Sequence, residues 1–425
     1  MNYNYRNETL HNTGFIKNET IGALAFSVLG LFCVVQHLFV YNYSVGNIPY
    51  IPLMQGAYIY MSYIVAFIFL LHFASRDSLL PKINEFTIPF MFFALAIIVV
   101  LLSDEKARSY GALMDTSIMQ LNLIYLGGSV LAFIVGYSLL GVGRFKSLII
   151  VGFILLVINV LVNVDKTTMT LNLKTDIKEK EGIYLMLGDT FGLWALLACV
   201  VVTHRLGRAT LVLISLICIA FLNSRTSLYA FIVAIPFVYR LRFGRIAVVI
   251  VIILVGLLSV APLLENQDGL IGRMFGSVIS GEDSSLNSRM FQFDVGLTSL
   301  ADHWFLGDYG GQIRDFGDFG AYLHNILSYW SQFGLIPFLL IISLWVKATL
   351  RAKSCIASDE AWADPDQRYF VVLLVFLGVE ALASRSYVHF MSWLALGRCA
   401  AFLNNKLLLA APTELLEQRE QKDYE

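Results

Sequence analysis

The chain has 425 residues, of which 57% are hydrophobic and 14% are charged, and its net charge is −1. Its mean hydropathy of +0.70 lies far above the range of soluble globular proteins. This composition predicts a membrane protein, and the small net charge disfavours nucleic acid as a partner. The five cysteines are spaced without a metal-ligand pattern, so we expect them to be small core residues, not disulfides or ligands.

Apolar segments recur from one end of the chain to the other. A helix needs about 20 apolar residues to cross a bilayer, and fewer where it is broken or packed inside protein. The segments long enough by this rule are 21–41, 53–74, 87–102, 121–141, 147–164, 186–203, 209–222, 226–239, 246–264, 323–346, 369–383 and 388–403. The expected fold class is therefore an all-α polytopic membrane protein with about 12 transmembrane helices.

The distribution of basic residues predicts which loops are cytoplasmic. If both termini are cytoplasmic, 19 Lys and Arg fall in cytoplasmic segments and 11 in outer ones, as the positive-inside rule requires. The expected organisation is a cytoplasmic N-terminal segment (1–20), transmembrane helices 1–9 (21–264), a large periplasmic loop (265–322), transmembrane helices 10–12 (323–404) and a cytoplasmic tail (405–425). In a bacterium, the outer side of this membrane would be the periplasm.

The large outer loop holds two distinct stretches. Residues 289–304 repeat apolar side chains every three or four positions, which predicts an amphipathic helix that lies on the bilayer or caps the spans. Residues 305–320 contain five glycines and predict a mobile lid. The acidic residues of the loop lack regular ligand spacing, so we expect no metal or other cofactor there (Asp302, Asp308, Asp315 and Asp318).

A few charged side chains stand at the outer ends of the predicted spans. Arg225 and Arg385 lie in tight SR[ST] turns, Arg289 opens the amphipathic segment, and His324 begins a span in the stretch GAYLHN. An arginine fork binds phosphate oxygens in a bidentate way, so several arginines at one mouth predict a pyrophosphate or carboxylate site. At the first turn of a helix, His324 would be neutral and able to take a proton from an attacking hydroxyl.

Simpler interpretations compete with this one. Arginines at span ends often anchor the protein in the headgroup region, and an interfacial histidine is often structural. Asp189 and Glu380 are candidates for a second carboxylate role or for ion pairs with arginine. Asn325 is a candidate for holding the His324 ring or a sugar hydroxyl, and Arg314 and Arg385 are further candidate substrate ligands.

Three stretches in this order resemble the O-antigen polymerase and O-antigen ligase superfamily of bacterial inner membranes. They are NSRTSLYAF (223–231), NSRMFQFDVGLTSLADHWFLGDYG (287–310) and YLHNILSYWSQFGLIPF (322–338). The resemblance implies metal-independent, inverting transfer of a glycan from an undecaprenyl-pyrophosphate-linked oligosaccharide to a sugar hydroxyl. It carries pyrophosphate binding onto Arg225 and Arg289 and the catalytic base onto His324. A chain-length regulator protein is a candidate partner, besides membrane lipid.

The resemblance leaves two acceptors open. Eight residues separate Asn325 from Gly334, and Pro337 stands where ligases have a small residue, which favours a polymerase that adds one lipid-linked repeat to another. The alternative is an O-antigen ligase that joins the glycan to lipid A-core. A transporter or flippase is the alternative from another class, but it predicts charges deep inside the spans, whereas here they gather at one mouth.

Overall fold

The computed structural model describes residues 18–49, 51, 64, 68, 79–108, 118–165, 169–171, 183–240, 284–317 and 323–402. These residues form helices and connections and, apart from one isolated bridge between Val164 and Leu171, no β-structure. The all-helical fold class is confirmed for this part of the chain. The predicted span 246–264 and the tail 405–425 lie outside it, as do Asp318, nearly all of the predicted span 53–74 and nearly all of the N-terminal segment.

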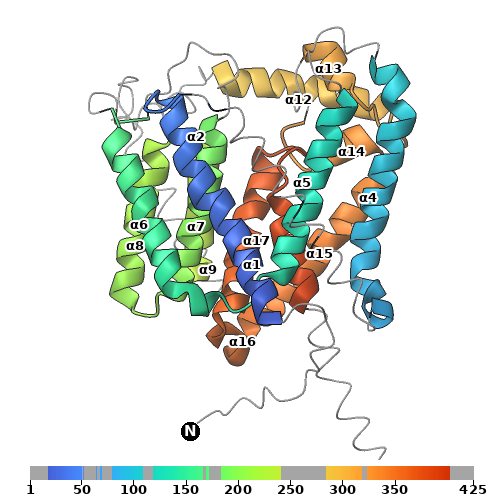
Figure 1. Cartoon of the computed structure of the whole chain (residues 1–425). Helices are drawn as coiled ribbons and strands as arrows, with labels where there is room; N and C mark the ends of the chain where they lie inside the picture. Colours follow the sequence, from blue (N-terminus) through green and yellow to red (C-terminus); the bar gives the residue numbers. More distant parts are fainter. Residues whose placement is uncertain are drawn as a thin grey trace, which may run out of the picture.

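The first half of the chain forms mostly long helices that run alternately up and down (Figure 1). A π-helical turn, Leu31–Val35, joins the first two helices into one rod. The elements are α1 (Asn18–Gly30), α2 (Gln36–Ser44), α4 (Leu79–Arg108), α5 (Ile118–Ser138), η3 (Val142–Phe145), α6 (Lys146–Asn163), α7 (Ile183–Val201), α8 (Arg205–Phe221) and α9 (Arg225–Val238). Most are apolar on several faces, as helices buried in protein and lipid are.

The second half of the chain adds two long helices, α15 and α17, and several shorter ones. The elements are α12 (Ser284–Asp302), α13 (Gly311–Phe316), α14 (Leu327–Phe333), α15 (Leu335–Ala357), α16 (Asp359–Ala363), α17 (Pro365–Ala383) and a last helix over 392–402. In Figure 1, α12 lies across the top of the bundle and α16 at the bottom. We call these two ends the α12 end and the α16 end.

Six described helical segments are long and apolar enough to cross a membrane. They are Thr20–Ser44, Phe86–Ser103, Ile118–Ser138, Val142–Asn163, Ile183–Val201 and Leu335–Ala357. Five coincide with predicted spans, but the sixth starts later than predicted because the chain breaks at Gly334. Four other predicted spans are also helical, but each of these helices is too short or not apolar enough to cross a membrane by the same measure. They are α8, α9, α17 and the helix 392–402. The total of twelve stays a prediction.

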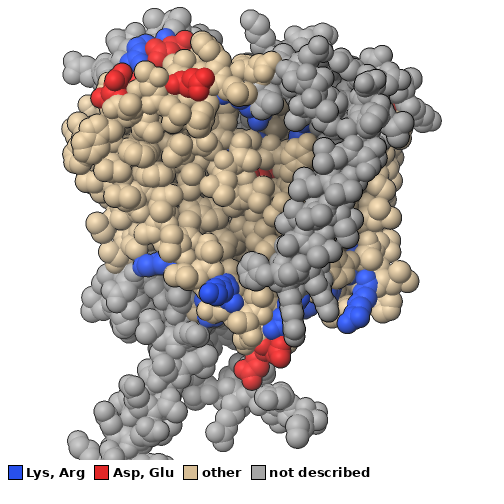
Figure 2. Space-filling view, turned by 180° about the vertical axis from the view of Figure 1, so that it is seen from behind, with Lys and Arg blue, Asp and Glu red and all other residues tan. Residues whose placement is uncertain are grey.

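The surface carries the charge pattern of a membrane protein. In Figure 2 a broad tan band separates charged side chains near the upper border from those near the lower one. Exposed apolar side chains are also common on α4, α6 and α15, for example Phe90, Val162 and Leu339. Large exposed apolar areas are stable only against lipid or another protein. The helices therefore belong to a protein embedded in a membrane.

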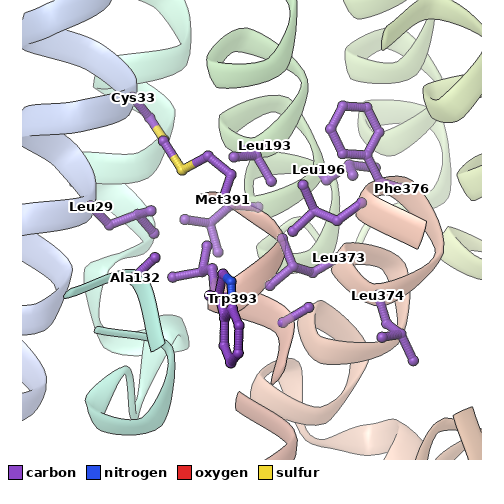
Figure 3. Packing of buried hydrophobic residues seen from close by; sticks show 14 of the residues in the cluster. Leu29, Cys33, Ala132, Leu193, Leu196, Leu373, Leu374, Phe376, Met391 and Trp393 are labelled. Carbon is purple, nitrogen blue, oxygen red and sulfur yellow. The ribbon is translucent and has the colours of Figure 1, made fainter. Parts of the chain in front are cut away.

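One continuous apolar core holds the long helices together. Figure 3 shows side chains from the α1 rod and α5 facing side chains of α7 and α17, with Met391 and Trp393 between them. Trp393 is fully buried, and its ring packs 4.5 Å from Phe93 of α4, centroid to centroid. The last described helix is therefore wrapped by earlier ones, and it fixes the turn that precedes it, residues 384–390, at the α12 end.

Candidate functional site

A second, smaller apolar cluster fixes α12 over the bundle. Leu300 of α12 packs with Leu323, which is 1% exposed, and Phe293 and Trp330 cover them. The Trp330 indole nitrogen also donates to the backbone oxygen of Trp304. Leu323 directly precedes His324, so burial of this leucine places the histidine beside α12. The predicted amphipathic helix at 289–304 is thus present, although it ends at Asp302.

His324 forms a hydrogen bond to a residue that the sequence patterns did not single out. Its Nε2 lies 2.9 Å from Oε1 of Gln292 on α12. An amide oxygen can only accept, so Nε2 carries the ring proton and Nδ1 keeps a lone pair. The ring orientation is therefore fixed by Gln292, and the nitrogen left as a base is Nδ1. One sequence signal was available: Gln292 lies three positions after Arg289, on the same face of a helix.

The predicted position of His324 in the first turn of a helix is wrong. Residues 323–326 form a bend, and α14 begins only at Leu327, whose backbone N–H donates to Oδ1 of Asn325 at 2.9 Å. Asn325 therefore starts the helix and does not hold the His324 ring. The imidazole is neutral for a different reason: burial, together with the positive charges of Arg289 and Arg385, lowers the pKa of His324 to about 4.

The break between α14 and α15 explains why residue 334 is a glycine. Gly334 has a φ of +86°, a conformation that strains residues with a side chain. A Cβ at this position would also lie 2.6 Å from the backbone oxygen of Phe305, which accepts a hydrogen bond from Leu335. The glycine lets the chain after α12 pack against the α14–α15 junction. It thereby sets the distance between α12 and the His324 bend.

Arg385 lies in a buried ionic cluster at the same end. Its Nε donates to Oδ2 of Asp189 at 2.9 Å, and its Nη2 donates to Oδ1 at 2.6 Å. The third group, Nη1, donates to Oγ of Ser384, and the side chain is 6% exposed. The predicted ion pair between Asp189 and an arginine is confirmed. In this structure Arg385 has protein acceptors for all three nitrogens, so its role as a substrate ligand stays a prediction.

Asp189 contacts three polar side chains, two from the turn 384–390 and one from α9. Besides Arg385, it accepts from Oγ of Ser227 at 2.6 Å, and Nε2 of His389 lies 3.0 Å from Oδ2. The preceding residue, Gly188, allows this approach, because a Cβ there would lie 2.3 Å from the Cβ of Ser224. A glycine next to the carboxylate thus lets α9 contact α7 closely enough for a serine to bond Asp189.

The two SR[ST] turns meet at this cluster. Arg225 is the first residue of α9 and is partly buried. Its neighbour Thr226 accepts a hydrogen bond from Oγ of Ser384 at 2.8 Å, directly before Arg385. Turns that are about 160 residues apart in sequence are therefore joined both by this bond and by Asp189. This bond joins the sequence neighbours of Arg225 and Arg385. Arg289 belongs to a different element, α12, where it lies one helical turn before Gln292.

Arg314 belongs to a third, separate network. On α13, its Nη2 donates to Oδ2 of Asp308 at 3.0 Å and its Nε donates to Asp315 at 2.7 Å. Asp308 is 1% exposed and also accepts from Ser299 of α12. The glycine-rich stretch is not a loose lid over its described part, 305–317, because Tyr309 and Ile313 are buried in the core. Two of the four loop aspartates therefore have ion-pair roles in packing.

The side chains near Asp189 also include types that bind metals. Asp189, Glu380 and His389 each have a ligand atom within 4.8 Å of the other two. Both oxygens of Asp189 already contact Arg385, Ser227 or His389, so this set leaves few free ligand atoms for a metal. No sequence pattern pairs His389 with Asp189, because the two residues are two hundred positions apart.

No protein-family model matches the chain, and a search of curated proteins finds no match either.

Proposed function

We propose that the chain is a membrane glycosyltransferase that polymerises O-antigen or exopolysaccharide repeat units. It would move a glycan from undecaprenyl pyrophosphate to a sugar hydroxyl at the periplasmic face of a bacterial inner membrane. The observation that carries the proposal is the placement of His324: Nε2 donates to Gln292, Nδ1 keeps its lone pair, and the charge of Arg289 lies close by. A neutral base beside positive charge suits attack by a hydroxyl and departure of an anion.

The proposed reaction is a single displacement. The acceptor hydroxyl oxygen attacks the anomeric carbon of the donor glycan on the face opposite the pyrophosphate. As this bond forms, the bond from the anomeric carbon to the pyrophosphate oxygen breaks, and the electron pair leaves with undecaprenyl pyrophosphate. Nδ1 of His324 takes the hydroxyl proton and later releases it to water. The configuration at the anomeric carbon is inverted, and no oxidant or reductant is needed.

The arginines would stabilise the charge of the leaving pyrophosphate. Arg289 is the first candidate, because it lies one helical turn from the residue that orients His324. Arg225 is the second, because hydrogen bonds link its turn to Arg385, whose charge also acts on His324. A guanidinium group binds two phosphate oxygens at once and stays charged, so two of them can replace the metal ion used in other pyrophosphate enzymes.

The position of the site agrees with a lipid-linked donor. Helix α12 lies across one end of the bundle (Figure 1), and His324 is hydrogen-bonded to it there. Met290 and Phe291 of α12 are mostly exposed, at 59% and 62%. Exposed apolar side chains on a helix that lies across the ends of membrane helices fit the headgroup region of a bilayer. The pyrophosphate of a lipid carrier would lie at this depth.

The test uses purified protein and the cognate undecaprenyl-pyrophosphate-linked repeat without lipid A-core. Products are separated on a gel that resolves single repeats. We expect a ladder, because the lipid-linked repeat would be both donor and acceptor. Transfer only after lipid A-core is added would overturn the polymerase in favour of the ligase. If folded protein forms no glycosidic bond under either condition, the glycosyltransferase proposal is wrong, and movement of the lipid-linked repeat between leaflets should be measured next.

A further inference from the structure

Glu380 is a buried carboxyl group that the proposed reaction does not use. It lies in the last turn of α17 and is fully buried, and neither of its oxygens accepts a hydrogen bond in the structure. Its carboxylate lies within 4.8 Å of the ligand atoms of Asp189 and His389. A buried carboxylate without a donor is costly, particularly at membrane depth. The surroundings of Glu380 must therefore supply something that neutralises it.

The charges around Glu380 do not supply a counterion. The titratable groups facing it are Asp189 from α7 and Arg385 and His389 from the turn after α17, while Tyr184 of α7 lies near Arg385. Arg385 is bound in a bidentate way to Asp189, so its single charge is matched by that carboxylate. From α9, Ser227 contributes its hydroxyl to Asp189. If Glu380 were ionised, two carboxylates would lie close together beside the guanidinium group of Arg385.

A metal ion does not relieve this crowding of carboxyl groups well. Nε2 of His389 already bonds Asp189 and is not available to a metal. A metal ion requires at least four ligands, whereas the described cluster supplies three side chains that can bind a metal, and the positive charge of Arg385 lies against Asp189. A proton needs only two oxygens, one from each carboxyl group.

We propose that Glu380 is held as a carboxylic acid that donates to Asp189, so that the two side chains form a buried binding site for one proton. Two carboxyl groups this close cannot both be ionised. The neutral acid satisfies one Glu380 oxygen as a donor and leaves the bidentate Arg385–Asp189 pair intact. Loss of the proton would set two carboxylates against each other, and it would weaken the contact that joins the two SR[ST] turns.

The proposal is tested on the full-length protein by infrared spectroscopy. A protonated carboxyl group has a carbonyl-stretching band that ionised groups lack, and exposed carboxyl groups are ionised at pH 7. We expect this band in wild-type protein at pH 7, a shift of the band in heavy water, and its loss in Glu380→Gln. The glutamine keeps the size and a donor group, so its melting temperature should match the wild-type value. Glu360→Gln, an exposed position on α16, is the matched control and should keep the band.

Three results would overturn the proposal. The band could be missing from folded wild-type protein at pH 7, or it could survive in Glu380→Gln, which would assign it to another residue. Elemental analysis could instead find a metal bound one to one that is lost in Glu380→Gln. None of these readouts uses substrate, so the proton site can fail while the glycosyltransferase proposal holds, and the reverse is equally possible.

Discussion

The α12 end of the molecule contains two polar regions that use their hydrogen-bonding groups differently. Around Asp189 the side chains are buried, and every nitrogen of Arg385 donates to a protein oxygen. Around His324 the ring is only partly buried, and its bond to Gln292 leaves the lone pair of Nδ1 for an acceptor role. The polar groups of the first region hold helices together, whereas the second region keeps an acceptor atom that a ligand could use.

This difference shows how to sort charged residues at a membrane interface. Sequence patterns treat Arg225, Arg289 and Arg385 alike, since each is an arginine at the outer end of a span. In the structure Arg385 differs from the other two, because its guanidinium group is buried in a bidentate pair with Asp189 and therefore contributes to packing. The predictions below test this division, from the largest expected effect to the smallest.

Removal of the Arg385 side chain should affect stability most. Arg385→Ala leaves Asp189 buried without its counterion, and breaking a buried pair in this way costs about 3–5 kcal/mol. We expect a large drop in melting temperature, measured in detergent. The double variant Arg385→Met with Asp189→Leu should recover most of it, because no charge remains buried. A single variant as stable as the wild type would show that the pair does not hold the turns together.

Removal of the Arg289 side chain should affect donor binding and not stability. A hydrogen bond to a charged group contributes about 1.5–3 kcal/mol, so Arg289→Ala should weaken binding of the undecaprenyl-pyrophosphate donor by about 10- to 100-fold. Binding is measured by titration of the purified protein with the donor. Arg205→Ala, an exposed arginine at the α16 end, is the control and should bind normally. Equal losses in both variants would indicate general attraction of an anion.

Loss of the Gln292 amide should slow the chemical step modestly. Gln292→Leu removes the acceptor that fixes the His324 ring, and one hydrogen bond is worth about 1 kcal/mol, so kcat should fall about 5-fold. KM for the donor should change little, because the arginines remain. Gln292→Glu should restore the acceptor and move the pH profile upward, since a carboxylate stabilises the imidazolium ion. Loss of donor affinity in Gln292→Leu would instead make this side chain a substrate ligand.

The pH dependence of the rate should differ between the free protein and the donor complex, because His324 has a different pKa in each. Its pKa in the free protein is lowered to about 4, so kcat/KM should be level near neutral pH and fall on the acid side as the ring is protonated. Bound pyrophosphate adds negative charge and raises this pKa, so the acid limb of kcat should lie at higher pH than that of kcat/KM. Coincident limbs would mean that the pyrophosphate binds away from His324.

The sequence predicts the described helices better than it predicts local geometry. Apolar length alone locates most of the described helices, and the amphipathic repeat at 289–304 locates α12, because burial in lipid or protein requires such patterns. The ion pair of Asp189 with an arginine is also predictable, since an isolated charge within a span needs a partner.

Local geometry depends on contacts that no short pattern records. The helix expected from residue 323 begins at Leu327 and breaks at Gly334, because the chain around Phe305 occupies the space beside it. Gln292 and His324 are 32 positions apart, and their pairing follows from the burial of Leu323 against α12. The meeting of the two SR[ST] turns likewise depends on how α9 and α17 pack, although the repeated motif hinted at a shared role.

The most direct test of the account is a single-turnover comparison of wild type and His324→Ala with the cognate lipid-linked repeat. Donor binding and glycosidic bond formation are measured in the same samples, with His303→Ala, an exposed histidine at the same end, as the control. We predict normal donor binding by His324→Ala and bond formation slowed by about 10²- to 10⁴-fold, the usual contribution of a general base. Bond formation at the wild-type rate, or loss of donor binding, would contradict the assignment of His324 as the base.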